Sequence, residues 1–176
     1  MICGDSGTGK STTLAALLER GCRMLSDDVT ALRAGQRAGL VEVLPGAAQT
    51  HLSADAARRL GYPVDPAQLQ PLRRMKATIM THGGLALWPA RLLALYVLRP
   101  SACDDVLVTE VTGGSKFRVL QECLYGPEFA PEHAALLPLM SAVATAAFFR
   151  LERPASRWSV SEVADAILAS APQLVP

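Results

Sequence analysis

A glycine-rich segment near the start of the chain carries the residues with the clearest chemistry. Positions 4–11 read Gly-Asp-Ser-Gly-Thr-Gly-Lys-Ser, which fits the spacing G-x-x-x-x-G-K-[ST] of a phosphate-binding loop. Glycines tolerate backbone angles that other residues avoid, so consecutive N–H groups can turn toward a phosphate. This segment predicts a nucleotide site. The expected nucleotide-binding residues are Gly4, Asp5, Ser6, Gly7, Thr8, Gly9, Lys10, Ser11 and Thr12.

A helix is expected directly after this loop. Apolar residues recur at helical spacing over positions 12–18, and Gly21 stands where a left-handed C-terminal cap belongs. The N-terminal end of such a helix attracts anions. Only positions 1–3 precede the loop, so we expect that part of the first strand lies outside the sequence.

Two adjacent carboxylates follow the next apolar run. Positions 23–26 are expected to form a short strand that ends at Asp27 and Asp28. In a phosphate-loop fold, the carboxyl end of that strand lies beside the loop, where carboxylates hold Mg²⁺ or meet a substrate hydroxyl. An acidic pair after a strand also forms ordinary turns and caps. The upstream loop favours the chemical interpretation.

The loop and the acidic pair together resemble HPr kinase/phosphorylase. The likeness consists of Gly-Asp-Ser-Gly-x-Gly-Lys-Ser, one helix, Arg-Gly, and a hydrophobic strand into Asp-Asp, and it covers positions 1–32. The rest of the chain is more loosely similar to smaller HPr-kinase-like proteins found beside lasso-peptide biosynthesis genes, which phosphorylate the terminal serine of a precursor peptide. The resemblance implies a P-loop domain of the HPr-kinase/PEP-carboxykinase type that uses ATP and Mg²⁺.

The same resemblance implies residue roles. Lys10 binds the β- and γ-phosphates and Ser11 binds the metal, while Asp27 is assigned as the general base and Asp28 as a metal ligand. Glu42 is a further candidate metal neighbour, because positions 41–46 keep a glutamate of the family's Glu-x-Arg-Gly-x-Gly signature and little else. The family's histidine upstream of the loop has no counterpart, so phosphorylase activity and carbohydrate regulation are expected less than peptide modification. HPr kinase is itself an oligomer, which leaves a homo-oligomer open.

Four further residues are candidates for contact with the substrate or its phosphate. Arg73, Arg74 and Lys76 form the best remaining cationic cluster, and phosphoryl transfer needs a cation to neutralise the moving charge. Lys76 is the first choice, although a solvated basic turn explains the cluster equally well. His51 is an alternative substrate contact, although a lone histidine is more often a surface residue.

Composition excludes several other classes. The 176 residues are 50% hydrophobic and 19% charged with a net charge of +1, so we expect one globular domain over positions 1–176 and no nucleic-acid partner. The four cysteines are scattered, which argues against a zinc site or a disulfide framework. No leader precedes the loop, so a cytoplasmic location is expected. Positions 134–149 are almost entirely apolar but too short to span a membrane, so a buried helix is expected there.

The remaining pattern predicts an α/β fold with a mixed sheet and flanking helices. A hairpin is expected around positions 34–39, and a helix from Ser53 to Leu60 that Gly61 ends. Positions 61–72 read as a Pro-rich loop. Strands are expected at 76–80, 92–98 and 106–111, and further helices at 116–125, with Ser115 as cap, and from a capping box at 159–162 to about 169.

Three other functions compete with a peptide serine kinase. A small-molecule kinase of the adenylylsulfate or gluconate type has a similar loop, but an Arg-rich helical lid is not evident in the middle of the sequence. An HPr(Ser) kinase-type regulator of carbohydrate metabolism remains an alternative within the family. A regulatory module that binds ATP without transferring phosphate is a third, which Lys10, Ser11 and the acidic pair argue against.

Overall fold

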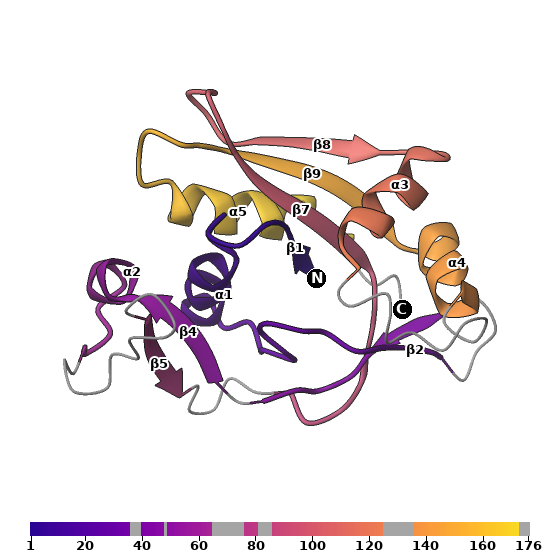
Figure 1. Ribbon diagram of the computed structural model, residues 1–176, viewed down its shortest axis with the longest axis horizontal. Coiled ribbons are helices and arrows are strands. Elements are labelled where there is room, and N and C mark those ends of the chain that lie inside the picture. Colours follow the sequence, from indigo (N-terminus) through magenta and orange to yellow (C-terminus); the bar gives the residue numbers. More distant parts are fainter. Residues whose placement is uncertain (36–39, 48, 65–75, 81–85, 125–135, 173–176) are drawn as a thin grey trace.

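The computed structural model describes residues 1–35, 40–47, 49–64, 76–80, 86–124 and 136–172. Its centre is a four-stranded sheet with the strand order β1-β7-β9-β8 (Figure 1). Strands β1, β7 and β9 run parallel, and β8 pairs antiparallel with β9. The expected α/β fold with a mixed sheet is therefore confirmed. The strands are β1 (Ile2–Cys3), β7 (Ala94–Ser101), β8 (Leu107–Val111) and β9 (Ala147–Pro154).

Strand β7 is central because its apolar residues 94–98 are buried on both faces of the sheet. Residues Ala94, Tyr96 and Leu98 contribute to the core that also contains helices α1 (Lys10–Glu19) and α5 (Val160–Ser170). The alternate residues, Leu95 and Val97, contribute to the core on the opposite side. A continuous apolar run is what a parallel strand covered on both faces requires.

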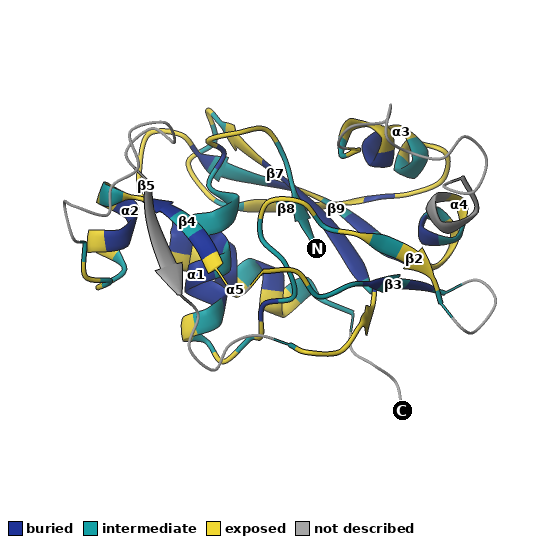
Figure 2. Ribbon diagram, turned by 60° about the horizontal axis from the view of Figure 1, so that its bottom comes forward, coloured by how far each residue is buried: buried dark blue, intermediate teal, exposed yellow. Residues whose placement is uncertain are grey.

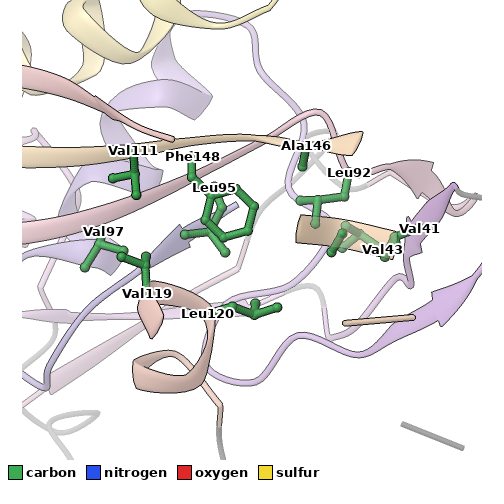
Figure 3. Packing of buried hydrophobic residues seen from close by; sticks show 11 residues of the cluster. Val41, Val43, Leu92, Leu95, Val97, Val111, Val119, Leu120, Ala146 and Phe148 are labelled. Carbon is green, nitrogen blue, oxygen red and sulfur yellow. The ribbon is translucent and has the colours of Figure 1, made fainter. Parts of the chain in front are cut away.

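The opposite face is covered by helices and by a hairpin. Helices α3 (Ser115–Glu122) and α4 (Leu136–Thr145) supply part of this core, and the buried residues of β3 (Val41–Val43) supply another part. Figure 3 shows these side chains meeting around Phe148 and Leu95. In Figure 2, β3 is mostly buried whereas its partner β2 (Leu32–Ala34) is more exposed. The expected hairpin is confirmed, and β6 (Ala90–Arg91) extends it.

A two-stranded sheet and a short helix lie beside α1. Strand β4 (Gln49–Ser53) pairs antiparallel with β5 (Lys76–Met80), and helix α2 (Ala54–Arg59) follows β4. The Ser53 hydroxyl accepts a hydrogen bond from the Ala56 N–H, and Gly61 adopts a φ of 76° after the helix. Both capping expectations for this helix are confirmed. Gly21 likewise takes a φ of 84° after α1.

The apolar run at positions 134–149 does not form one helix, which corrects the expectation. Helix α4 ends at Thr145, and β9 begins two residues later. The last three residues of the run, 147–149, begin β9, which pairs in parallel with β7 over its whole length, from Ala94 opposite Ala147 to Ser101 opposite Pro154. Burial in the sheet therefore overrides the local helical pattern, because a short apolar run suits either element.

Three smaller expectations also fail. Residues 23–26 form only an isolated bridge at Met24 rather than a regular strand. The expected capping box does not form either, because the Glu162 carboxylate binds Arg157 and the buried Ser159 hydroxyl finds no partner within the described residues. At α3 the N-cap is Gly114, not Ser115.

Within the described residues, no helix is long and apolar enough to cross a membrane.

Replacing Gly4 by alanine is expected to destabilise the protein. A Cβ at this position would lie 2.5 Å from the Leu98 carbonyl oxygen, and the φ of +140° is one that side chains rarely adopt. We expect Gly4→Ala to lower the free energy of unfolding by about 2 kcal/mol or more, measured by urea denaturation. Gly114→Ala is the matched control, because it meets nothing within 4 Å and has no positive φ. Equal stabilities of the two variants would contradict this account.

Candidate functional site

The glycine-rich loop joins β1 to α1 and is held against the central sheet. Gly4, Gly7 and Gly9 adopt φ values of 140°, 87° and 107°. The Thr8 N–H and hydroxyl both donate to the Asp5 carbonyl, and Gly9 forms the N-cap of α1 in a left-handed conformation. The loop therefore leads directly into the N-terminus of a helix, where backbone N–H groups lack helical partners and attract anions.

The side chain of Lys10 folds back over this loop. Its Nζ atom donates to the Gly4 carbonyl at 2.8 Å and to the Asp5 carbonyl at 2.9 Å. Both acceptors are neutral, so these contacts hold the ammonium group at the loop without cancelling its charge. An ammonium group held at this position can contact a phosphate at the loop.

Asp27 is the residue that connects the loop to the rest of the site. Its Oδ1 atom accepts a hydrogen bond from the Ser11 hydroxyl at 3.1 Å. Its Oδ2 atom accepts from the Thr50 hydroxyl at 2.7 Å and from the His51 backbone N–H at 3.2 Å. Thr50 is fully buried. The carboxylate is thus held in one orientation, facing the hydroxyl that follows the loop lysine.

These groups line a cavity of about 680 Å³, which falls in the size range of small-molecule sites. Ser6, the loop glycines, Thr12, the acidic pair and His51 all contribute to its wall. Asp28 is exposed there, next to the half-buried Asp27. Leu120, Glu122, Cys123 and Leu124, at the end of α3, are also in its lining. The structure therefore brings together the loop, both aspartates and His51, as the sequence predicts.

The other predicted site residues lie elsewhere or outside the described structure. Glu42 is in β3, where its carboxylate accepts a hydrogen bond from Arg33 at 2.8 Å, and it is not part of the cavity lining. Lys76 opens β5 opposite Ser53, with only its backbone described. Arg73 and Arg74 fall outside the described residues. The structure thus does not bring Glu42 to the acidic pair.

The oxygen atoms of Ser11 and Asp27 fit a magnesium ion. Mg²⁺ prefers oxygen ligands, keeps several waters, and is usually held by one or two carboxylates together with substrate phosphates. No group of three or more His, Cys, Asp or Glu side chains able to hold a metal occurs among the described residues. A hydroxyl and a carboxylate at 3.1 Å supply the smaller protein donor set that a nucleotide-bound Mg²⁺ requires.

Two thiols also meet at the wall of the cavity. The Cys123 thiol donates a hydrogen bond to the Cys3 sulfur, which lowers the pKa of Cys3, while burial opposes the change and Lys10 reinforces it. The same hydrogen bond raises the pKa of Cys123. Both cysteines are free.

Sequence reasoning missed one basic residue that contacts the loop. Arg153, near the end of β9, donates from Nε to the Thr8 carbonyl at 2.8 Å across a separation of 145 residues. No motif surrounds it in the sequence. The only available signal was its place at the carboxyl end of a parallel strand, where sites gather, and the apolar run at 134–149 concealed that strand.

No family model, curated protein or solved structure matches the chain.

The hydrogen bond between Thr50 and Asp27 is expected to show as an energetic coupling. Asp27→Ala leaves the buried Thr50 hydroxyl without its acceptor, which costs about 1–3 kcal/mol of unfolding free energy. Once Thr50→Val has removed that hydroxyl, Asp27→Ala should cost about 1 kcal/mol less. Urea denaturation of the two single variants and the double variant measures this difference. Asp28→Ala, an exposed control, should be additive with Thr50→Val, and additivity at Asp27 as well would rule out the coupling.

Proposed function

We infer that the protein is an ATP- and Mg²⁺-dependent kinase that transfers the γ-phosphoryl group to a serine hydroxyl of a peptide or protein. The observation that carries this proposal is the Ser11 hydroxyl at 3.1 Å from the Asp27 carboxylate, beside Lys10 at the mouth of the loop. A loop lysine, a metal-binding hydroxyl and a nearby carboxylate are the parts that P-loop phosphotransferases share. The proposal includes an HPr-kinase-like P-loop fold and a cytoplasmic location.

The contacts favour a division of roles within the acidic pair that reverses the one expected from the sequence. Asp27 is fixed by Thr50 and by the His51 N–H so that it faces Ser11, which is the place of a metal partner. Asp28 is exposed in the same cavity, where an acceptor hydroxyl has access. We therefore assign Asp28 as the general base and Asp27, with Ser11, as the ligand pair for Mg²⁺.

The reaction then uses each group once. Lys10 and the loop bind the β- and γ-phosphates, and Mg²⁺, when bound, neutralises their charge. The serine oxygen forms a bond to the γ-phosphorus, the bond from that phosphorus to the bridging oxygen breaks, and ADP leaves. The serine proton passes to the Asp28 carboxylate. Positioning and charge stabilisation supply most of the catalysis in such a transfer.

The acceptor that we propose is the C-terminal serine of a lasso precursor peptide. Val29, next to Asp28, and Leu124, just after α3, also line the cavity, and both of these apolar side chains are exposed. An open, partly apolar wall beside the base suits the end of a flexible peptide better than a small polyol. A small-molecule kinase predicts the opposite preference, so the choice of acceptor distinguishes the two.

The first test is phosphate transfer to peptides. The protein is incubated with Mg-ATP and a precursor peptide that ends in serine, and the intact mass is expected to gain one phosphoryl group. Two controls are used: the same peptide with a terminal alanine in place of the serine, and gluconate as a small polyol. Phosphate on gluconate would favour a small-molecule kinase, and equal phosphate on the alanine-ended peptide would contradict the terminal serine as the acceptor.

Lys10→Ala is expected to abolish phosphate transfer, because it removes the ammonium group that contacts the phosphates. A rate within about threefold of the parent, under 1 kcal/mol of activation free energy, would exclude the assignment of the phosphate loop.

The second test separates the two aspartates. Asp28→Asn is expected to lower kcat by about 10² or more with an unchanged Mg²⁺ requirement, because it removes the proton acceptor. Asp27→Asn should instead raise the Mg²⁺ concentration needed for half-maximal rate, because it weakens a ligand. Steady-state kinetics over a Mg²⁺ titration measure both effects. Identical behaviour of the two variants would mean that the pair acts as one metal site.

A further inference from the structure

Arg153 contacts the phosphate loop from a distant part of the chain. Its Nε atom donates to the carbonyl of Thr8, a buried residue within the loop, at 2.8 Å. Its Nη1 atom donates to the Pro154 carbonyl at 3.0 Å. The guanidinium group is part-buried and stands near the end of β9, which pairs with β7. It therefore ties the loop to the sheet by a charged hydrogen bond.

The same guanidinium lies against the residue where α1 begins. A Cβ built on Gly9 would be 3.5 Å from Nε of Arg153 and 3.9 Å from Nη2. Gly9 has a φ of 107° and caps the helix that points at the expected phosphate position. The two acceptors that the structure shows for Arg153 are carbonyl groups, so its charge remains uncancelled close to the loop.

We propose that Arg153 is a positioning residue for nucleotide phosphates. Its hydrogen bond fixes the Thr8 carbonyl on the sheet side, which holds the following N–H groups of the loop in the form that accepts a phosphate. Its charge adds to that of Lys10. The proposal rests on the proposed function, because it assumes that the loop binds nucleotide phosphates. A purely structural role, in which Arg153 only secures the end of β9, is the competing explanation.

The geometry makes arginine hard to replace. Nε and Nη1 bind two separate carbonyl groups at once, which the planar guanidinium allows and a lysine ammonium group does not reproduce. Arg153→Lys should therefore keep part of the effect and Arg153→Gln little of it. Arg150→Gln is the matched control, because Arg150 lies on the same strand and is exposed.

The deciding measurement is nucleotide affinity. By isothermal titration of the full chain, Arg153→Gln should raise the Kd for Mg-ATP about tenfold, because binding must then order the loop and one neighbouring positive charge is gone. The Kd for AMP, which lacks the β- and γ-phosphates, should change less. The Kd of Arg153→Lys for Mg-ATP should lie between those of the parent and Arg153→Gln. Arg150→Gln should bind Mg-ATP with the Kd of the parent. With active enzyme, the KM for the peptide acceptor should stay constant. A lowered Tm with an unchanged Kd for Mg-ATP would show a purely structural anchor and overturn the proposal.

A second readout does not need a nucleotide. Hydrogen exchange of the loop amides between Thr8 and Ser11 is measured in the ligand-free parent and in Arg153→Gln. Faster exchange confined to the loop supports the positioning role, and unchanged exchange overturns it. If the parent protein binds no Mg-ATP, the proposed kinase function fails, and the exchange experiment still decides whether Arg153 holds the loop. The two failures are therefore distinguishable.

Discussion

The three hydrogen bonds to the Asp27 carboxylate are the constraint on which the rest of the site depends. Residues 23–26 form only an isolated bridge at Met24, so sheet pairing ends before the chain reaches the acidic pair. The carboxylate instead joins the start of α1, through Ser11, to β4, through Thr50 and the His51 N–H. The buried Thr50 hydroxyl makes this arrangement specific, because a buried polar group without a partner is costly. The position of Asp28 follows from that of its neighbour.

The central sheet provides the rigid support behind the loop. Strand β7 is buried on both faces, with α1 and α5 on one side and α3, α4 and β3 on the other. Its Leu98 carbonyl lies so close to Gly4 that no side chain fits between them. The next strand, β9, brings Arg153 to the Thr8 carbonyl. The loop is thus held by two neighbouring strands on one side and continues into α1 on the other, while its Lys10 side faces the cavity.

Local rules in the sequence predicted those features whose cause is local. The glycine spacing placed the loop, Gly21 marked the end of α1, and Ser53 with Gly61 bounded α2 correctly. Features set by distant pairing were not predictable in this way. Apolar residues 147–149 suit a helix or a strand until β7 is beside them, and the contact of Arg153 with the loop exists only because β9 ends next to it. Both aspartates were expected beside the loop and line the same cavity, but the contact of Asp27 with Thr50 was not predictable, because no motif identifies Thr50.

The neutral acceptors of Lys10 give the cavity an electrical polarity. The Lys10 ammonium group donates to the Gly4 and Asp5 carbonyls, so the loop side of the cavity keeps a positive charge. Asp27 and Asp28 place negative charge on the wall of the same cavity. A free polyphosphate is attracted to the first wall and repelled by the second. On the proposed function, we infer that this polarity favours a polyphosphate that carries a divalent cation over a bare one.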